Sequence, residues 1–181
     1  MQKITKTSHL LYRLFQVLSW FLPLITVYLF LFKFEMLQSI GFWSHSIALN
    51  YQIHDMANFS FIHKMLILAI ECIPLSITVL ICHKLSKLFH LFEQGSLFEE
   101  ENIRLIKQIS ICMILSEMLQ LIYQPLATLA LSFNNPAGER FISLTFGSTN
   151  LSTLITGFII LVASWIMQEA QQLKSETLLT I

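Results

Sequence analysis

Four long apolar stretches constrain this chain more than any other feature of its sequence. A helix that crosses a lipid bilayer needs about 20 mostly apolar residues, whereas transmembrane β-strands are short and strictly alternating. The stretches are long and continuous, and they cover residues 14–33, 64–83, 108–131 and 148–167. We therefore predict an all-α fold, an integral membrane four-helix transmembrane bundle.

The composition fits this prediction, because charged residues make up only 12% of the chain and soluble domains usually carry about 25%. No stretch resembles a linker between domains, so we expect residues 1–181 to form a single membrane domain. The formal net charge is zero and no basic stripe is present, which argues against nucleic acid as a partner. The first stretch is too long for a signal peptide, and we expect it to be retained.

The distribution of Lys and Arg predicts the orientation, because these residues are enriched on the cytoplasmic side. With four spans, both termini share a side with the segment between the second and third spans. That side carries eight of the 11 basic residues, and the other side carries Lys33, Lys64 and Arg140. We expect both termini to be cytoplasmic in a multi-pass protein of the bacterial inner membrane.

Residues 35–63 and 132–147 are then outer loops. In the first loop, residues 36–43 are predicted to form a short amphipathic helix at the membrane interface, and Trp43 has the character of an interface anchor. The same loop contains several potential metal ligands: His45, His54, Asp55 and His63. Their spacing matches no ligand pattern, so we predict no metal site and no cofactor.

Between the second and third spans, residues 84–107 are predicted to form a cytoplasmic helical hairpin. Gly95 would end one helix, and Ser96 followed by Glu99 is a capping box that would start the next. The hairpin has an apolar face, made of Phe89, Phe92, Leu97, Phe98 and Ile103. This face either packs on itself and on the C-terminal tail, which we favour, or docks a cytoplasmic protein partner.

The hairpin also carries a resemblance to a known family. Its residues 91–103 read LFEQGSLFEEENI, with the pattern F-x-x-G-x-x-F-x-x-x-N at Phe92, Gly95, Phe98 and Asn102. This pattern resembles domain of unknown function 2975, a family of small bacterial inner-membrane proteins. The resemblance implies four helices, no enzyme activity, and companionship with small helix-turn-helix regulators. The tail departs from the family at residues 175–177, which are less acidic than the family pattern.

Four polar residues inside the spans form a candidate buried polar membrane site: Glu71, Glu117, Gln120 and Gln124. Apart from Lys33 and Lys64 at the ends of two spans, no Lys or Arg lies within a span to neutralise the acids. We therefore expect them to be protonated, because desolvation disfavours the charged form. The two acids differ in depth by roughly 7 Å at 1.5 Å per residue. Glu71 should therefore bond to Gln120 or Gln124 more easily than to Glu117.

The buried acids have two interpretations. As structural groups they would join helices through hydrogen bonds, assisted by a stripe of small residues at Thr153, Gly157 and Ser164. As functional groups they would carry or sense protons. We favour the structural interpretation, and with it a non-enzymatic membrane protein that regulates or scaffolds a cytoplasmic partner. The alternative is a small proton- or ion-coupled transporter, which would need a homo-oligomer to form a pathway.

Overall fold

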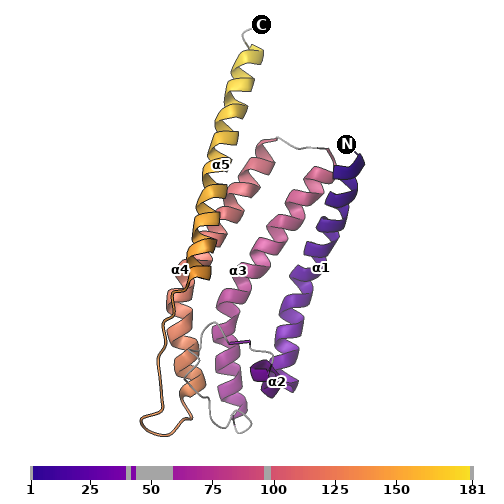
Figure 1. Ribbon diagram of the computed structural model, residues 1–181. Helices are drawn as coiled ribbons and strands as arrows, with labels where there is room; N and C mark the ends of the chain where they lie inside the picture. Colours follow the sequence, from indigo (N-terminus) through magenta and orange to yellow (C-terminus); the bar gives the residue numbers. More distant parts are fainter. Residues whose placement is uncertain (1, 40–41, 44–58, 96–98, 180–181) are drawn as a thin grey trace. The chain divides into compact units, whose positions relative to one another are not determined.

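The computed structural model describes residues 2–39, 42–43, 59–95 and 99–179, and it is helical wherever those residues form regular structure (Figure 1). Its elements are α1 (Gln2–Phe32), α2 (Phe34–Ser39), α3 (Phe61–Glu93), α4 (Glu100–Ser132) and α5 (Ser148–Leu179). Four of these helices are long and apolar enough to cross a membrane. The prediction of an all-α protein with four such helices is confirmed.

Large apolar side chains on these helices face outward. Trp20 on α1 is 72% exposed and Ile166 on α5 is 64% exposed. A soluble protein would bury such residues at helix faces, because leaving apolar area in water is unfavourable. Lipid is the solvent that fits this surface, which is the surface of a multi-pass membrane protein.

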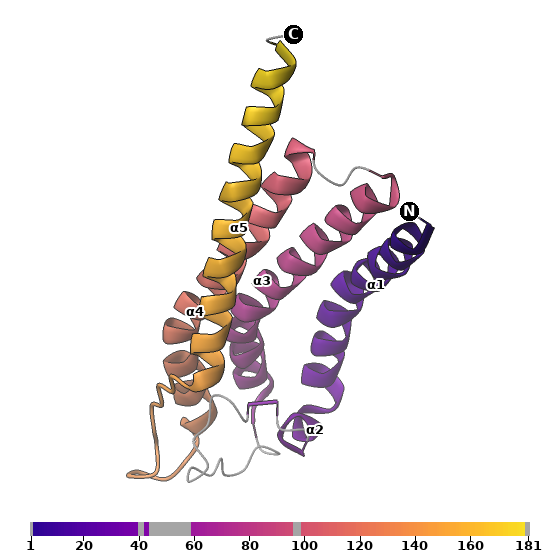
Figure 2. The same ribbon diagram turned by 45° about the horizontal axis from the view of Figure 1, so that its top comes forward.

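The chain divides into two compact units, and α1, α3 and α4 each contribute residues to both (Figure 2). Unit 1 consists of residues 1–20, 78–117 and 148–181. Unit 2 consists of residues 21–77 and 118–147. Each unit has its own packing.

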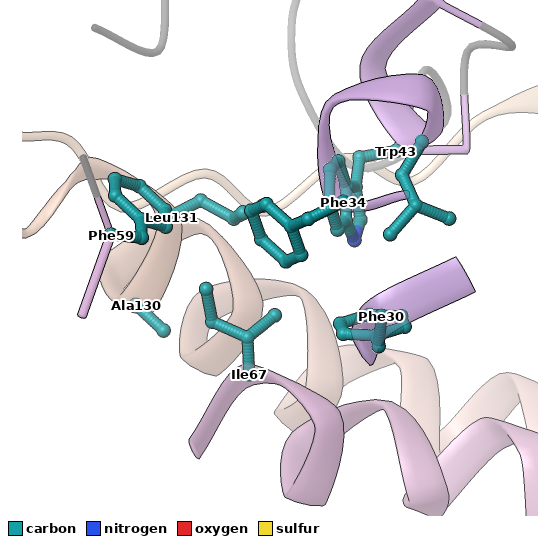
Figure 3. Packing of buried hydrophobic residues seen from close by; sticks show 8 residues of the cluster. Phe30, Phe34, Trp43, Phe59, Ile67, Ala130 and Leu131 are labelled. Carbon is teal, nitrogen blue, oxygen red and sulfur yellow. The ribbon is translucent and has the colours of Figure 1, made fainter. Parts of the chain in front are cut away.

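Unit 2 is built around an aromatic core to which α2 contributes (Figure 3). Phe30 of α1 meets Phe34 and Trp43 edge-on, with ring centroids 5.6 and 6.1 Å apart, and Leu37 is fully buried. The cluster consists of Phe30, Phe34, Leu37, Trp43, Phe59, Ile67, Ala130 and Leu131. The helix predicted at residues 36–43 lies at Phe34–Ser39 instead. Phe34, Leu37 and Trp43 are buried in this core, so Trp43 is not an exposed anchor, whereas Met36 is 53% exposed.

Unit 1 is held by a smaller apolar cluster and by close packing of α5 on α4. Leu88 of α3 packs with Leu105 and Ile109 of α4. Gly157 of α5 is so close to α4 that an added Cβ would lie 3.0 Å from Cγ1 of Ile114. The small-residue stripe predicted on the fourth span therefore does face another helix, with Ser164 fully buried one heptad further along.

Candidate functional site

Glu71 lies in the interior of unit 2 and is only 4% exposed. Its Oε1 atom accepts two hydrogen bonds, one from Nε1 of Trp43 and one from the hydroxyl of Tyr123, both at 2.6 Å. The carboxyl group comes from α3, the phenol from α4, and the indole from the chain that follows α2. Glu71 thus connects three segments that are distant in sequence. A buried carboxyl group needs such donors, because an unmet polar group in an apolar surrounding is costly.

The expected partners of Glu71 were wrong. Gln120 and Gln124 do not bond to it; instead Nε2 of Gln124 donates to Oε1 of Gln120 at 3.4 Å, and Oε1 of Gln124 accepts from the backbone N–H of Thr145 at 2.7 Å. The two glutamines do lie on one stripe of α4, but Gln124 bonds to the backbone of Thr145 and not to Glu71. Trp43 and Tyr123 were not among the predicted site residues.

Glu117 has its own partner in unit 1. Its Oε2 atom accepts a hydrogen bond of 2.7 Å from Nδ2 of Asn150, in the first turn of α5. Glu117 is half-buried, and its position next to a helix N-terminus is favourable for a group with negative character. The four predicted polar residues therefore do not form one site: Glu71 and Glu117 belong to different units and have different partners.

The glutamine stripe belongs to a polar ladder between α4 and the extended segment 141–145. Three buried side chains, one turn apart on α4, accept the N–H groups of alternate residues of that segment. Phe141 donates to Oγ of Ser132 at 3.1 Å. Ser143 donates to Oγ1 of Thr128 at 3.0 Å, and Thr145 donates to Oε1 of Gln124.

The ladder works because two different backbone repeats nearly match. Four residues of helix advance about 6 Å, and two residues of extended chain advance about 6.6 Å. Side chains at every fourth position of α4 therefore meet N–H groups at every second position of the segment. Non-helical backbone next to lipid must find hydrogen-bond partners within the protein, and Gln124, Thr128 and Ser132 provide them. Residues 132–147 therefore form a loop, as predicted, and part of it is bonded along α4.

At the end of α3, the hairpin prediction is partly testable. Gly95 has φ +89°, the left-handed conformation expected at a helix C-terminus. Its N–H donates to the carbonyl of Phe92 at 3.2 Å. Phe92 packs against the cluster of Leu88, Leu105 and Ile109. The end of α3 and the beginning of α4 therefore pack together, while Phe89 of the same predicted face stacks on Phe15 of α1, with ring centroids 5.8 Å apart.

The start of α4 differs from the prediction. Ser96 and Phe98 lie outside the described residues, and α4 begins at Glu100. The carbonyl of Glu99 accepts from the N–H groups of Asn102 and Ile103, at 3.1 and 3.3 Å. Glu99 is therefore the residue that precedes the helix, where the capping box had placed Ser96. Asn102 is fully buried and Ile103 is 3% exposed, so the family pattern includes core positions of unit 1.

Polar and ionic contacts surround this end of unit 1. Lys87 pairs with Glu101 at 2.6 Å, and Arg104 pairs with Glu100 at 2.9 Å, one turn away on the same helix. His9 of α1 meets Glu93 at 2.8 Å, and Lys84 donates to Oε1 of Gln108 at 2.7 Å. These pairs involve α1, α3 and α4, at or beyond the ends of the predicted spans.

An apolar groove of about 610 Å³ lies between the beginning of α3 and the end of α4, with His63 and Phe133 among its lining residues. His63 stacks on Phe59 and bonds through Nε2 to the carbonyl of Ala130. His45, His54 and Asp55 lie outside the described residues. Within the residues that are described, no three His, Cys, Asp or Glu side chains are grouped as metal ligands.

Comparison with known proteins gives one match. The family described as "Protein of unknown function (DUF2975)" matches residues 5–181, nearly the whole chain. No curated protein matches the chain, and no solved structure matches it either.

Proposed function

This chain belongs to the DUF2975 family, and from that premise we propose that it is a non-enzymatic protein of the bacterial inner membrane that regulates or scaffolds a cytoplasmic partner. The contact surface would be the end of unit 1 formed by the α3–α4 hairpin and the last turns of α5. A small helix-turn-helix regulator is the class of partner that we propose.

The observation that carries this proposal is the arrangement of polar helix ends in unit 1. Beyond its apolar body, α5 continues through the polar residues 168–174. Ala170, Gln171 and Lys174 of this part line a cavity of about 320 Å³ together with Ile103 at the start of α4. The end of α5 and the hairpin therefore form one composite surface. Helices that only anchor a protein in lipid have no need to extend into such a surface.

The proposed orientation places this surface in the cytoplasm. The basic residues of the hairpin, Lys84, Lys87, Arg104 and Lys107, lie at the same end of unit 1 as the polar part of α5. An excess of Lys and Arg in short loops marks the cytoplasmic side. Reporter fusions after Ile181 and within residues 134–138 test the orientation. We expect a cytoplasmic signal from the first and a periplasmic signal from the second, and the reverse result would contradict the proposal.

The alternative of a proton- or ion-coupled transporter receives less support. A transport site needs groups that can release their partners and face a pathway. Glu71 is instead closed in by the indole of Trp43 and the phenol of Tyr123, and Glu117 is bonded to Asn150. Both acids therefore resemble structural connections between segments.

Site-specific photo-crosslinking in intact cells tests the partner directly. We place the photoreactive residue at Leu173, which is 58% exposed on the polar end of α5. The matched control is Phe158, which is 53% exposed on the apolar body of the same helix. The proposal expects a discrete cytoplasmic protein adduct from position 173 and none from position 158. If both positions yield only lipid adducts, no partner docks at this surface.

A further inference from the structure

The extended segment that follows α4 forms backbone hydrogen bonds along only one of its two edges. In extended backbone, the N–H and C=O groups of one residue point to one side, and those of the next residue point to the opposite side. Phe141, Ser143 and Thr145 direct their N–H groups to α4, and the carbonyl of Phe141 also accepts from Ser132 there. The backbone groups of Ile142, Leu144 and Phe146 must therefore point away from α4.

Nothing in the described part of the chain meets this second edge. No hydrogen bond to the backbone of Ile142, Leu144 or Phe146 is present among the described residues. Their side chains are 66%, 59% and 56% exposed. Figures 1 and 2 both show the trace after α4 running back along that helix with no further helix of unit 2 outside it.

The surroundings make an open edge costly. The ladder side chains Gln124 and Thr128 belong to the third predicted span, and α4 as a whole has the length and hydropathy of a membrane-crossing helix. Lipid offers no hydrogen bonds, so an unmet backbone group in contact with it is strongly unfavourable. An open strand edge is also a template for pairing with another strand.

We propose that residues 142–146 form the interface of a homodimer, in which this segment pairs antiparallel with the same segment of a second copy. The two-fold axis would pass beside Leu144, so that Leu144 faces Leu144 of the other copy and Ile142 faces Phe146. This register uses the N–H and C=O groups of all three residues and leaves none of them unmet. An interface about a two-fold axis needs a surface that is complementary to itself, and a short edge paired about its central residue has that property.

The side chains suit this pairing. Ile142 opposite Phe146 is a β-branched residue opposite an aromatic one, a favourable cross-strand combination. Ile142, Leu144 and Phe146 carry no charge that would be brought together in the dimer. The ladder to α4 is not disturbed, because it uses the opposite edge of the same segment.

Cysteine crosslinking in native membranes tests both the dimer and its register. The background replaces Cys72, Cys82 and Cys112, because all three are free thiols. A homobifunctional thiol reagent of short span should convert Leu144→Cys to a covalent dimer, since directly opposed Cβ atoms in such a pair are about 5 Å apart. Ile142→Cys and Phe146→Cys should each remain monomeric alone and crosslink when the two variants are expressed together. Monomers at every position, or crosslinking of Ile142→Cys with itself, would overturn the proposal.

Proline substitution separates the interface from the fold. Leu144→Pro removes an N–H group on the open edge and keeps the three bonds to α4, so we expect it to abolish the dimer while thermal stability of the monomer in detergent is kept. Leu144→Ala keeps the backbone and should still dimerise. Ser143→Pro removes a ladder bond and should lower thermal stability in detergent. A Leu144→Pro protein that folds and still forms dimers would contradict pairing through this edge.

Discussion

Unit 2 and unit 1 differ in what their polar side chains contact. In unit 2 the polar groups are inside: Glu71 is 4% exposed, Thr128 and Ser132 are fully buried, and each contacts a part of the chain that is not a long helix. In unit 1 the ion pairs are outside, as at Lys87 and Glu101, whose side chains are about half exposed. Unit 1 also buries Ser110 and Ser164, but their hydroxyls donate to carbonyls three residues earlier in their own helices. Buried polar groups that bond to non-helical backbone are thus described for unit 2.

The two units differ because helical and extended backbone find their hydrogen-bond partners in different places. A helix satisfies its own N–H and C=O groups except at its ends, so long helices in unit 1 can pack through apolar contacts such as Leu88 with Leu105. Segment 141–145 has no such internal bonds and needs acceptors from α4. Removing polar groups from the two units should therefore have very different effects on stability.

The largest effect is expected for Glu71→Leu. It leaves the N–H of Trp43 and the hydroxyl of Tyr123 buried without their acceptor, at a cost of about 1–3 kcal/mol for each donor. Glu71→Gln retains a carbonyl oxygen in nearly the same place and should cost much less. The free energy of unfolding, measured by SDS titration in mixed micelles, compares the two variants. Equal losses for Leu and Gln would mean that the acceptor oxygen is not what stabilises unit 2.

Thr128→Val should come next, because it removes one acceptor and preserves the shape of the side chain. The N–H of Ser143 would lose its partner, and we expect a loss of about 1–3 kcal/mol in the same titration. Thr153→Val is the matched control in unit 1. The Thr153 hydroxyl donates to the carbonyl of Thr149, one turn back on α5. Removing this donor leaves no N–H group without an acceptor, so the loss should be small. A comparable loss for both would contradict the contrast between the units.

Gly95→Ala and Gly138→Ala should have similar, smaller effects. Both glycines have positive φ, +89° and +99°, and neither has any atom within 4 Å of an added Cβ. The cost is therefore the conformational one alone, about 1–2 kcal/mol for a side chain in the left-handed region. One glycine lies in each unit, so the pair shows whether the same conformational cost lowers the stability of the two units equally. A much larger loss at Gly95 would show that the hairpin turn contributes more than its backbone conformation.

The smallest effect is expected for Glu101→Gln. It removes the ion pair with Lys87, but exposed pairs are screened by solvent and salt and contribute little. The unfolding midpoint in the SDS titration should not change measurably, and Glu100→Gln, which removes the pair with Arg104, should behave in the same way. A clear loss of stability from either variant would show that these exposed ion pairs stabilise unit 1, which would contradict the expectation.

Sequence patterns identified the candidate polar residues more successfully than their partners. Glu71 was recognisable because a carboxyl group interrupts an apolar stretch, and Gln124 because it shares a stripe with Gln120. The stripe Gln124, Thr128 and Ser132 was also visible at a spacing of four residues, and it is the signal that could have revealed the ladder. What it could not reveal is its target, since Phe141, Ser143 and Thr145 are extended only because α4 offers them acceptors.

The sequence by itself determined that this protein has four long apolar helices, since hydropathy and length act locally along the chain. It also determined the left-handed turn at Gly95, because a residue without a Cβ adopts that conformation at little cost. Only the tertiary structure decided that Trp43 turns inward to Glu71 and that segment 141–145 lies against α4. Those choices depend on hydrogen bonds between residues far apart in sequence, and the energy of such a bond exists only after the segments have met.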